Sequence, residues 1–308
     1  MKVLLFGSNG LVGSSIKRLL STTVNKEKYN GEFSTRKDTD LFSYKETKDK
    51  IDSFKPDIII NAAAKVGGIH ANNTNRTTFL IENLKINLNI LESCKNINPI
   101  KIINLGSSCI YPLNAPNPIS EESIMTGKLE ETNSPYAMAK LTSIELGNAI
   151  KREHGHKVVN LMPTNLYGPN DNFSENQSHV IPGLVHRMHI AKKNNETVFK
   201  IWGSGNPLRE FLHVDDLSSS ILFLIENSID EELINIGSGK EVSISDLAKI
   251  IKNIIGYSGE LTFNKDMPDG NPRKLLDSSK IQKLGWKPKI SLEEGISNTY
   301  KWYLENIN

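Results

Sequence analysis

Tyr136 and Lys140 are the two residues of this chain whose types and spacing most directly suggest chemistry. Residues four apart lie on one face of a helix, so the phenol and the ammonium would be neighbours. A phenol with a reference pKa of about 10 exchanges protons poorly at neutral pH until a nearby cation favours its ionised form. Lys140 is placed to supply that charge, and the pair would then deliver a proton to a carbonyl oxygen. Many solvated helices carry this spacing by accident, so its meaning depends on its surroundings.

Alternating strands and helices must position this pair. Near-continuous apolar runs predict four buried parallel strands, at residues 3–6, 57–60, 101–104 and 158–161. Apolar side chains at three- and four-residue spacing predict helices between them, at residues 11–20, 79–96 and 134–154. The predicted fold class is therefore α/β, a Rossmann-type doubly wound parallel sheet.

The regular alternation ends near residue 163, where Gly, Pro and Asn become frequent. The later segments mix helices with short strands, which predicts a smaller α/β substrate domain in the C-terminal half. We expect residues 1–165 and about 212–236 to form the dinucleotide-binding domain, and about 166–211 and 237–308 the substrate domain. A strand at residues 211–214 is expected to return to the main sheet and lead into a helix from Asp215. Binding sites favour such domain junctions.

Length and composition exclude several classes of protein. A chain of 308 residues holds one large domain or two smaller ones. Its formal net charge of +2 gives no reason to expect nucleic acid or an anionic membrane as a partner. No apolar run approaches the ~18 residues that span a bilayer. Cys94 and Cys109 are too few for a disulfide framework, and no signal-like segment opens the chain, so we expect a cytoplasmic enzyme; no metal site is predicted.

A glycine-rich turn follows the first predicted strand and opens the first helix. Residues 7–13 read Gly-Ser-Asn-Gly-Leu-Val-Gly, a variant of the commoner Gly-x-Gly-x-x-Gly pattern. Glycines permit a tight turn and close backbone approach, and the helix N-terminus offers free N–H groups to a pyrophosphate. This turn predicts a dinucleotide site.

The choice of dinucleotide is expected near the end of the second strand, at residues 32–36. A carboxylate there would accept hydrogen bonds from a ribose 2′-hydroxyl, whereas Arg36 offers a charge-assisted site for a 2′-phosphate. Arg36 therefore favours NADP, although Asp38 and Asp40 follow closely and weaken that preference. Residues 61–64, Asn-Ala-Ala-Ala, supply small side chains where a cofactor could lie close to the backbone.

Ser107 lies just beyond the strand that ends at Asn104, at the carboxyl edge where open α/β sheets bind ligands. Its hydroxyl could hold a substrate carbonyl. Together with Tyr136 and Lys140 it resembles the Ser/Tyr/Lys set of the short-chain dehydrogenase/reductase superfamily, in the extended branch that acts on nucleotide sugars.

The chain resembles the GDP-L-fucose synthase family still more closely. The stretches that carry this resemblance span almost the whole chain, at residues 62–69, 106–112, 163–169, 178–182, 202–205, 209–216 and 268–274. The resemblance implies NADPH-dependent 3,5-epimerisation and 4-reduction of GDP-4-keto-6-deoxy-D-mannose to GDP-L-fucose. It also implies a homodimer formed through the helices that begin near Phe79 and Ser134.

Epimerisation beside a ketone removes a proton and returns one to the other face, which requires an acid–base pair. Cys109 and His179 suit this because a thiol and an imidazole both titrate close to neutrality, and the resemblance implies this role for them. Tyr136 would then protonate the C4 oxygen as hydride arrives, with Ser107 bonding that oxygen and Lys140 tuning the phenol. A lone cysteine or histidine is more often structural, so both assignments depend on the resemblance.

The resemblance also implies the full set of site residues. The catalytic residues are then Ser107, Cys109, Tyr136, Lys140 and His179. The NADP-binding residues are Gly7, Ser8, Asn9, Gly10, Leu11, Val12, Gly13, Arg36, Asp40, Leu41, Ala62, Ala63, Leu105, Gly106, Tyr136, Lys140, Pro163, Asn165, Leu166 and His179. The residues that bind the GDP-sugar are Ser107, Ser108, Cys109, Asn165, Arg187, Trp202, Arg209 and Asp269. Guanidinium groups suit a diphosphate, whereas Trp202 is either a core residue or a wall beside the guanine.

Other functions fit less well. Related dehydratases need an acidic residue where this chain has Ser108 and Cys109. C4-epimerases need no Cys/His pair, and a catalytically silent NADP sensor needs no proton donor. A nearer alternative is a C4 reductase, with little or no epimerisation, of a related GDP-4-keto sugar such as a GDP-6-deoxy-4-keto-heptose. The sequence leaves this open because loop changes accommodate one added hydroxymethyl group.

Overall fold

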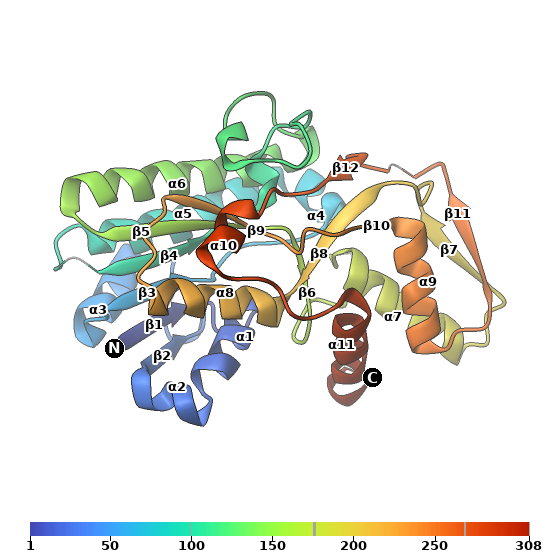
Figure 1. Ribbon diagram of the computed structural model, residues 1–308, viewed down its shortest axis with the longest axis horizontal. Coiled ribbons are helices and arrows are strands. Elements are labelled where there is room, and N and C mark those ends of the chain that lie inside the picture. Colours follow the sequence, from blue (N-terminus) through green and yellow to red (C-terminus); the bar gives the residue numbers. More distant parts are fainter. Residues whose placement is uncertain (99, 175–176, 268, 308) are drawn as a thin grey trace.

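The computed structural model describes residues 1–98, 100–174, 177–267 and 269–307, so Pro268 of the last stretch above lies outside the described residues. Figure 1 shows a larger part, built on a sheet with helices on both faces, beside a smaller part of short strands and helices. The chain passes between the two parts several times.

The larger part is built on a six-stranded parallel sheet in the order β2-β1-β3-β4-β5-β9. Its strands are β1 (Lys2–Phe6), β2 (Asn30–Ser34), β3 (Ile58–Asn61), β4 (Lys101–Leu105), β5 (Lys157–Pro163) and β9 (Leu233–Ile236). This confirms the predicted doubly wound sheet. The strand order reverses between β1 and β3, and ligands bind at the carboxyl edge beside such a switch point.

Alternate residues of these strands face two helical layers (Figure 1). On one face, Val3 and Leu5 share a core with residues of α1 (Leu11–Leu20) and α8 (Val214–Glu226), with α2 (Thr23–Lys28) at the edge. On the other face, Leu4 and Phe6 pack against α3 (Tyr44–Phe54), α5 (Arg76–Cys94) and α6 (Ser134–His154). Cys94 is fully buried in this second core, as expected.

The helix predicted at residues 79–96 begins earlier, at Arg76, and follows a short helix that was not predicted, α4 (Ile69–Thr74). Three of the six residues of α4 are Asn or Thr, which gave no apolar periodicity. Its buried face is made by Ala71 and Asn72. This helix matters because it forms one wall of the site described below.

The smaller part contains two further sheets. Its elements are β6 (Asn165–Tyr167), α7 (Val180–Lys193), β7 (Val198–Trp202), β8 (Leu208–His213), β10 (Glu241–Ser243), α9 (Ile244–Ile255), β11 (Glu260–Asn264), β12 (Arg273–Lys274) and α11 (Leu292–Asn306). Strand β8 pairs with β6, β10 and β12, and β7 pairs with β11. A core that includes Tyr167, Phe199 and Tyr303 holds these elements together.

One predicted strand pairs differently. Residues 211–213 belong to β8 in the second sheet, so their expected return to the main sheet is wrong. The chain returns instead through α8, which begins at Val214, and β9; the short helix α10 (Ser279–Leu284) later packs against β9. An apolar run predicts a buried strand, but it does not specify which sheet the strand joins.

A ladder of buried asparagines fixes the carboxyl edge of the main sheet. Asn61, Asn104 and Asn160 share one register across β3, β4 and β5. Asn104 Nδ2 donates to Asn160 Oδ1 at 2.9 Å, and Asn61 Nδ2 donates to Asn104 Oδ1 at 3.4 Å. Asn61 Oδ1 accepts a hydrogen bond from Ala63 N at 3.2 Å. Paired in this way, the buried amides rigidify the turn that follows β3.

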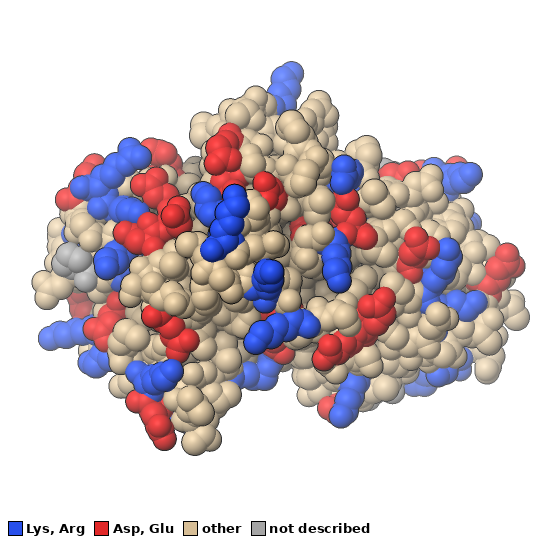
Figure 2. All heavy atoms as spheres, in the orientation of Figure 1, with Lys and Arg blue, Asp and Glu red and all other residues tan. Residues whose placement is uncertain are grey.

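Figure 2 shows basic and acidic side chains interspersed over one face of the molecule. Among the helices of the described residues, none is both long and apolar enough to cross a membrane. The described residues also contain no cluster of three His, Cys, Asp or Glu side chains able to hold a metal ion.

Candidate active site

The glycine-rich turn joins β1 to α1 at the switch point of the sheet. Gly7 has φ +79°, and a Cβ at Gly7 would lie 2.7 Å from Ala63 N. A Cβ at Gly13 would overlap Gly7 O. At Gly10, the N-cap of α1, a Cβ would meet Gly7 O at 3.6 Å and, its own chain neighbours aside, no other atom of the described residues within 4 Å. Gly7 and Gly13 thus permit close packing, while Gly10 leaves the approach to the helix N-terminus open.

The turn fits the pyrophosphate of a dinucleotide. Ser8 Oγ is buried and has no hydrogen-bond partner among the described residues. A buried hydroxyl left without a partner costs about 1–3 kcal/mol. The first turn of α1 has no acidic residue and no side-chain cap, so its N–H groups and helix dipole favour an anion.

The loop after β2 carries an exposed guanidinium, that of Arg36, stacked on Phe42 with its central carbon 5.1 Å from the ring centroid. Asp38 accepts hydrogen bonds from Thr35 Oγ1 at 2.6 Å and from Thr35 N at 2.8 Å, which lower the pKa of its carboxyl. Asp40 Oδ1 accepts from Phe42 N at 3.0 Å. Both carboxylates therefore accept hydrogen bonds from the loop itself and order the segment that carries Arg36.

The remaining residues expected at the cofactor lie along the same sheet edge. Leu41 packs against the core beside α3. Ala62 N donates to Phe6 O at 3.1 Å, and Gly106 N donates to Leu161 O at 2.8 Å. The turn after β1 and the start of α1 hold Asn9, Leu11 and Val12. The carboxyl ends of β3 and β4 hold Ala62, Ala63, Leu105 and Gly106. The end of β5 and the start of β6 hold Pro163, Asn165 and Leu166.

Ser107, Cys109 and Tyr136 come together beyond β4. Ser107 caps the 3₁₀ helix η1 (Ser108–Ile110), its Oγ accepting a hydrogen bond from Cys109 N at 3.2 Å. Cys109 packs against a small buried cluster of Ala71, Phe79 and Tyr136. Tyr136 lies in the first turn of α6, and its phenol interacts with the Ser107 side chain. The structure therefore joins a hydroxyl, a thiol and a phenol that are 29 residues or less apart in sequence, at the edge predicted for ligands.

Lys140 lies one helical turn beyond Tyr136 and is buried. Its Nζ donates to Leu105 O at 2.7 Å and lies 5.9 Å from the centroid of the Tyr136 ring. We expected Lys140 to ease ionisation of the phenol, but burial dominates both groups: it raises the pKa of Tyr136 and lowers the pKa of Lys140 to about 8. Tyr136 therefore holds its proton at neutral pH, which suits a proton donor better than a base.

Burial of the Lys140 ammonium predicts a pH-dependent gain in stability for Lys140→Met. Below pH 8 the folded wild type must bury the charged Lys140 ammonium, which costs stability. Between pH 8 and about 10.5, Lys140 is neutral in the folded state but still charged in the unfolded state, so this cost is relieved. The stability of the wild type therefore rises relative to that of the variant over this range. We expect K140M to melt at a higher temperature than the wild type at pH 7, with the difference shrinking between pH 8 and 10. Calorimetry without added nucleotide measures the two melting temperatures at each pH. A difference in melting temperature that stays constant from pH 7 to 10 would contradict the prediction.

His179 is the N-cap of α7 and lies across Gly68 from this cluster. Gly68 N donates to Gln177 O at 3.3 Å, and a Cβ at Gly68 would lie 2.8 Å from Ser178 O. The imidazole keeps exposed surface, yet desolvation by surrounding protein lowers its pKa. The imidazole is therefore neutral at pH 7.

The expected GDP-sugar residues of the smaller part also gather at one place. The Arg187 guanidinium carbon lies 5.1 Å from the Trp202 ring centroid, and Trp202 is 53% exposed, so the tryptophan is not a core residue. Asp269 accepts from Ser204 N at 2.6 Å and from Ser204 Oγ at 2.7 Å. Arg209 Nη2 donates to Asp269 O at 3.3 Å.

This second cluster faces the first. A Cβ at Gly270, next to Asp269, would lie 3.4 Å from Ile69 Cδ1 and 3.6 Å from Arg209 Nη2. Ile69 begins α4, and Ala71 of the same helix touches the Tyr136 cluster. The four residues Arg187, Trp202, Arg209 and Asp269 therefore lie across α4 from the Ser107–Tyr136 cluster.

Glu210 was not singled out from the sequence, although it lies next to Arg209. Its buried carboxylate accepts hydrogen bonds from Gly239 N at 2.7 Å and Leu276 N at 3.1 Å, and its backbone oxygen accepts from Asn165 Nδ2 at 2.8 Å. These partners lie on three segments that pass between the two parts of the molecule. The residue next to Arg209 is thereby hydrogen-bonded to all three of these segments.

Asn133 was also missed. Its Nδ2 donates to Cys109 Sγ at 3.6 Å, across 24 positions of sequence. No local pattern signals such a contact, because it depends on how the loop before α6 folds back over η1.

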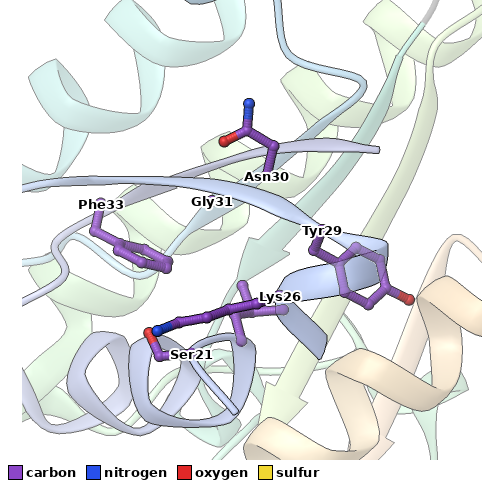
Figure 3. Close-up of a pocket in the computed structure, with 7 residues that line it drawn as sticks. Ser21, Lys26, Tyr29, Asn30, Gly31 and Phe33 are labelled. Carbon is purple, nitrogen blue, oxygen red and sulfur yellow. The ribbon is translucent and has the colours of Figure 1, made fainter. Parts of the chain in front are cut away.

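Two cavities lie away from these clusters or only border them. One, of about 350 Å³, is lined by residues from the end of α1, from α2 and from the start of β2, including Ser21, Lys26, Tyr29 and Phe33 (Figure 3). It lies at the amino end of β2, opposite the carboxyl edge of the main sheet. The other, of about 460 Å³, borders the glycine turn at Ser8 and Asn9.

Comparisons with known proteins agree with this geometry. The model of the NAD dependent epimerase/dehydratase family matches residues 3–237. GDP-L-fucose synthase 1 of Arabidopsis thaliana is 46% identical over 306 residues, 99% of this chain and 94% of its own. A GDP-6-OMe-4-keto-L-xylo-heptose reductase from C. jejuni superposes with TM-score 0.89 at 30% identity, covering 99% and 97% of the two chains. A GDP-L-fucose synthetase from Naegleria fowleri bound to NADP gives TM-score 0.88 at 29% identity, covering 99% and 94%.

Proposed function

Because the chain belongs to the NAD dependent epimerase/dehydratase family, we propose that it converts GDP-4-keto-6-deoxy-D-mannose to GDP-L-fucose, epimerising C3 and C5 and reducing C4 with NADPH. The observation that carries this proposal is the packing of Cys109 against Tyr136. It puts a group able to exchange protons with carbon beside a group able to protonate a carbonyl oxygen. The heptose reductase above is less similar, at 30% identity against 46%, so the alternative of C4 reduction with little epimerisation is not favoured.

The cofactor is NADP(H), which supplies the hydride for C4 when bound. In our proposal the turn from Gly7 to Gly13 receives the pyrophosphate, and the unpartnered Ser8 hydroxyl donates a hydrogen bond to it. Arg36 pairs with the 2′-phosphate. The small residues at the carboxyl ends of β3 and β4 leave room for the nicotinamide half near Tyr136.

Cys109 and His179 form the proposed epimerising pair. One removes a proton from the carbon beside the ketone, so that the C–H electron pair forms the enolate C=C bond and the carbonyl π pair moves to the C4 oxygen. The other returns a proton to the opposite face, and the same exchange is repeated at the second carbon. The ketone is required for both exchanges, so C4 reduction comes last.

Tyr136 and Ser107 complete the reduction. The phenol donates its proton to the C4 oxygen as that oxygen gains charge, and Ser107 holds the oxygen by a hydrogen bond. The raised pKa of Tyr136 keeps this proton in place until then. Lys140, tied to Leu105 O at 2.7 Å, supplies a positive charge one helical turn away.

The substrate spans both parts in this proposal. Residues 1–165 and about 212–236 hold the cofactor, whereas about 166–211 and 237–308 hold the GDP moiety. Arg187 and Arg209 pair with the diphosphate, with Trp202 and Asp269 beside the nucleoside. Ser107, Ser108, Cys109 and Asn165 contact the sugar. Two free cysteines fit a reducing cytoplasm.

The proposal is tested by incubating the protein with GDP-4-keto-6-deoxy-D-mannose and NADPH in deuterated water. We expect NADPH oxidation and a product with L-galacto configuration that carries deuterium at both C3 and C5. NADPH oxidation without deuterium at either carbon would leave a simple reductase and contradict the epimerase half. Absence of both reactions, with retained NADPH binding, would point to a sensor.

A homodimer through α5 and α6 is part of the proposal. Ile81 and Leu88, seven residues apart on α5, are 45% and 41% exposed, and Met138 on α6 is 48% exposed. Ile81 and Leu88 lie on one face of α5, and α5 packs beside α6, so a second copy that covers these helices would bury exposed apolar side chains of both. We expect sedimentation of a dimer at micromolar concentration, converted to monomer by Ile81→Glu with Leu88→Glu. Val24→Glu, at a 65% exposed site on α2, is the matched control and should stay dimeric.

A further inference from the structure

We propose that Asn133 is a positioning residue for Cys109, whose side-chain amide holds the sulfur and stabilises its thiolate during proton exchange. This inference rests on the proposed function, in which Cys109 exchanges protons with the sugar. The contact itself does not: it joins Asn133 Nδ2 and Cys109 Sγ at 3.6 Å.

The other end of the same amide is also distinctive. Asn133 Oδ1 is buried and has no hydrogen-bond partner among the described residues. An amide needed only for folding would usually be satisfied at both ends. Here Nδ2 binds the Cys109 sulfur, while Oδ1 remains an acceptor without a partner among the described residues. Such an arrangement is expected of an amide that positions a functional side chain.

Neighbouring residues hold Asn133 in place. It is the last residue of the 3₁₀ helix η3 (Glu131–Asn133) and the N-cap of α6. The Glu130 carboxylate accepts hydrogen bonds from Asn133 N at 3.2 Å and from Thr132 Oγ1 at 2.6 Å. Arg76 of α5 donates to Glu131 O at 2.8 Å. The backbone of Asn133 is therefore fixed from two sides, and its amide is pre-organised toward the sulfur.

A donated N–H stabilises a sulfur that carries negative charge more than a neutral thiol. Cys109 packs against apolar Ala71 of α4 and Phe79 of α5 and the neutral phenol of Tyr136 of α6. The nearby cation is Lys140, whose Nζ lies 5.9 Å from the centroid of the Tyr136 ring. The thiolate is the form that takes a proton from carbon, forming an S–H bond while the C–H electron pair becomes part of the enolate. Asn133 therefore favours Cys109 as the member of the pair that removes the proton.

The test measures Cys109 reactivity without any substrate. Iodoacetamide alkylates thiolates, and Cys94 is fully buried with a pKa raised to about 12, so the folded protein reports Cys109 alone. We expect isosteric Asn133→Asp, which replaces the donor by a carboxylate, to slow alkylation at pH 7.5 by about tenfold or more, and to move the rate profile to higher pH. Asn133→Ala should slow it less. Asn298→Asp, an exposed site on α11 with the same change of charge, should match the wild type.

Alkylation of N133A at the wild-type rate across pH 6–9 would overturn the proposal, even if N133D is slow, because the new carboxylate of N133D disfavours the thiolate by its own charge. If N133D does not melt cooperatively, the alkylation rates of N133A alone test the proposal. Cys109→Ser gives the background rate of alkylation in the absence of the Cys109 thiol. Deuterium exchange into the substrate separates the two proposals. Slowed alkylation in N133D together with unimpaired exchange in C109S would refute the catalytic role of Cys109 while leaving its contact with Asn133 established.

Discussion

Replacing Tyr136 by phenylalanine is expected to lower the rate of C4 reduction by about 10²–10⁴-fold, the range for loss of general acid catalysis. The substitution removes only the hydroxyl. The ring keeps its edge contact with Phe79, with centroids 6.4 Å apart, and its place beside Cys109. Since the proposed epimerising pair is intact, deuterium should still enter C3 and C5, and exchanged 4-keto sugar should accumulate. NADPH oxidation and mass spectrometry of the nucleotide sugar measure the two effects.

Tyr257→Phe is a matched control for this experiment. Tyr257 is also buried, and its hydroxyl bonds to Glu196 O at 2.9 Å in the smaller part, far from the sheet edge. It should cost stability but leave turnover by the folded enzyme unchanged. Fluorescence titration with NADPH separates a lost proton donor from lost cofactor binding. Full reductase activity in Y136F would mean that the proton comes from elsewhere, and loss of deuterium exchange as well would contradict the division of labour between Tyr136 and Cys109.

The sequence predicted the parts of the site that depend on local geometry. A glycine turn between an apolar run and a helix has few alternatives, because Gly7 needs a positive φ and Gly13 has no room for a Cβ. Ser107 could be placed at the carboxyl edge because it follows a buried parallel strand. Tyr136 and Lys140 could be paired because helical spacing fixes which side chains are neighbours.

What the sequence did not predict depends on contacts between distant segments. The effect of Lys140 on Tyr136 was misjudged because spacing says nothing of burial, and desolvation proved the largest influence on both groups. Strand β8 was assigned to the wrong sheet for a similar reason. Glu210 and Asn133 escaped notice because a single glutamate or asparagine carries no pattern, and each acquires its role only from partners many residues away.

Two proton-handling groups from different elements share one wall of the site. Cys109 and Tyr136 touch the same small cluster, yet one follows β4 and the other begins α6. A ketone held by Ser107 would thus meet, on one side, both a group that addresses its neighbouring carbons and a group that addresses its oxygen. If these groups act in succession on one bound sugar, removing the first should leave the second able to work on the unepimerised ketone.

Cys109→Ser is therefore expected to lower deuterium exchange at C3 and C5 by about 10²–10⁴-fold while C4 reduction continues. Serine preserves the shape of the side chain, but a hydroxyl is a far weaker acid than a thiol and does not provide an anion at neutral pH. The product should then be a GDP-6-deoxyhexose reduced at C4, with C3 and C5 in their original configuration and free of deuterium. Product analysis by NMR after incubation with NADPH in deuterated water measures this.

Cys94→Ala supplies the matched control, because Cys94 is the other cysteine of the chain and is fully buried on α5, where its sulfur donates a hydrogen bond to Ile90 O. It should retain both exchange and reduction in the protein that folds. Wild-type exchange in C109S would require another base, and the role of Cys109 would reduce to packing. Loss of reduction as well as exchange would mean that only the epimerised ketone is a substrate for Tyr136, so supplying pre-epimerised 4-keto sugar to C109S should then restore NADPH oxidation. If it did not, Cys109 would have to take part in the reduction itself, and the assignment of separate roles to the thiol and the phenol would be wrong.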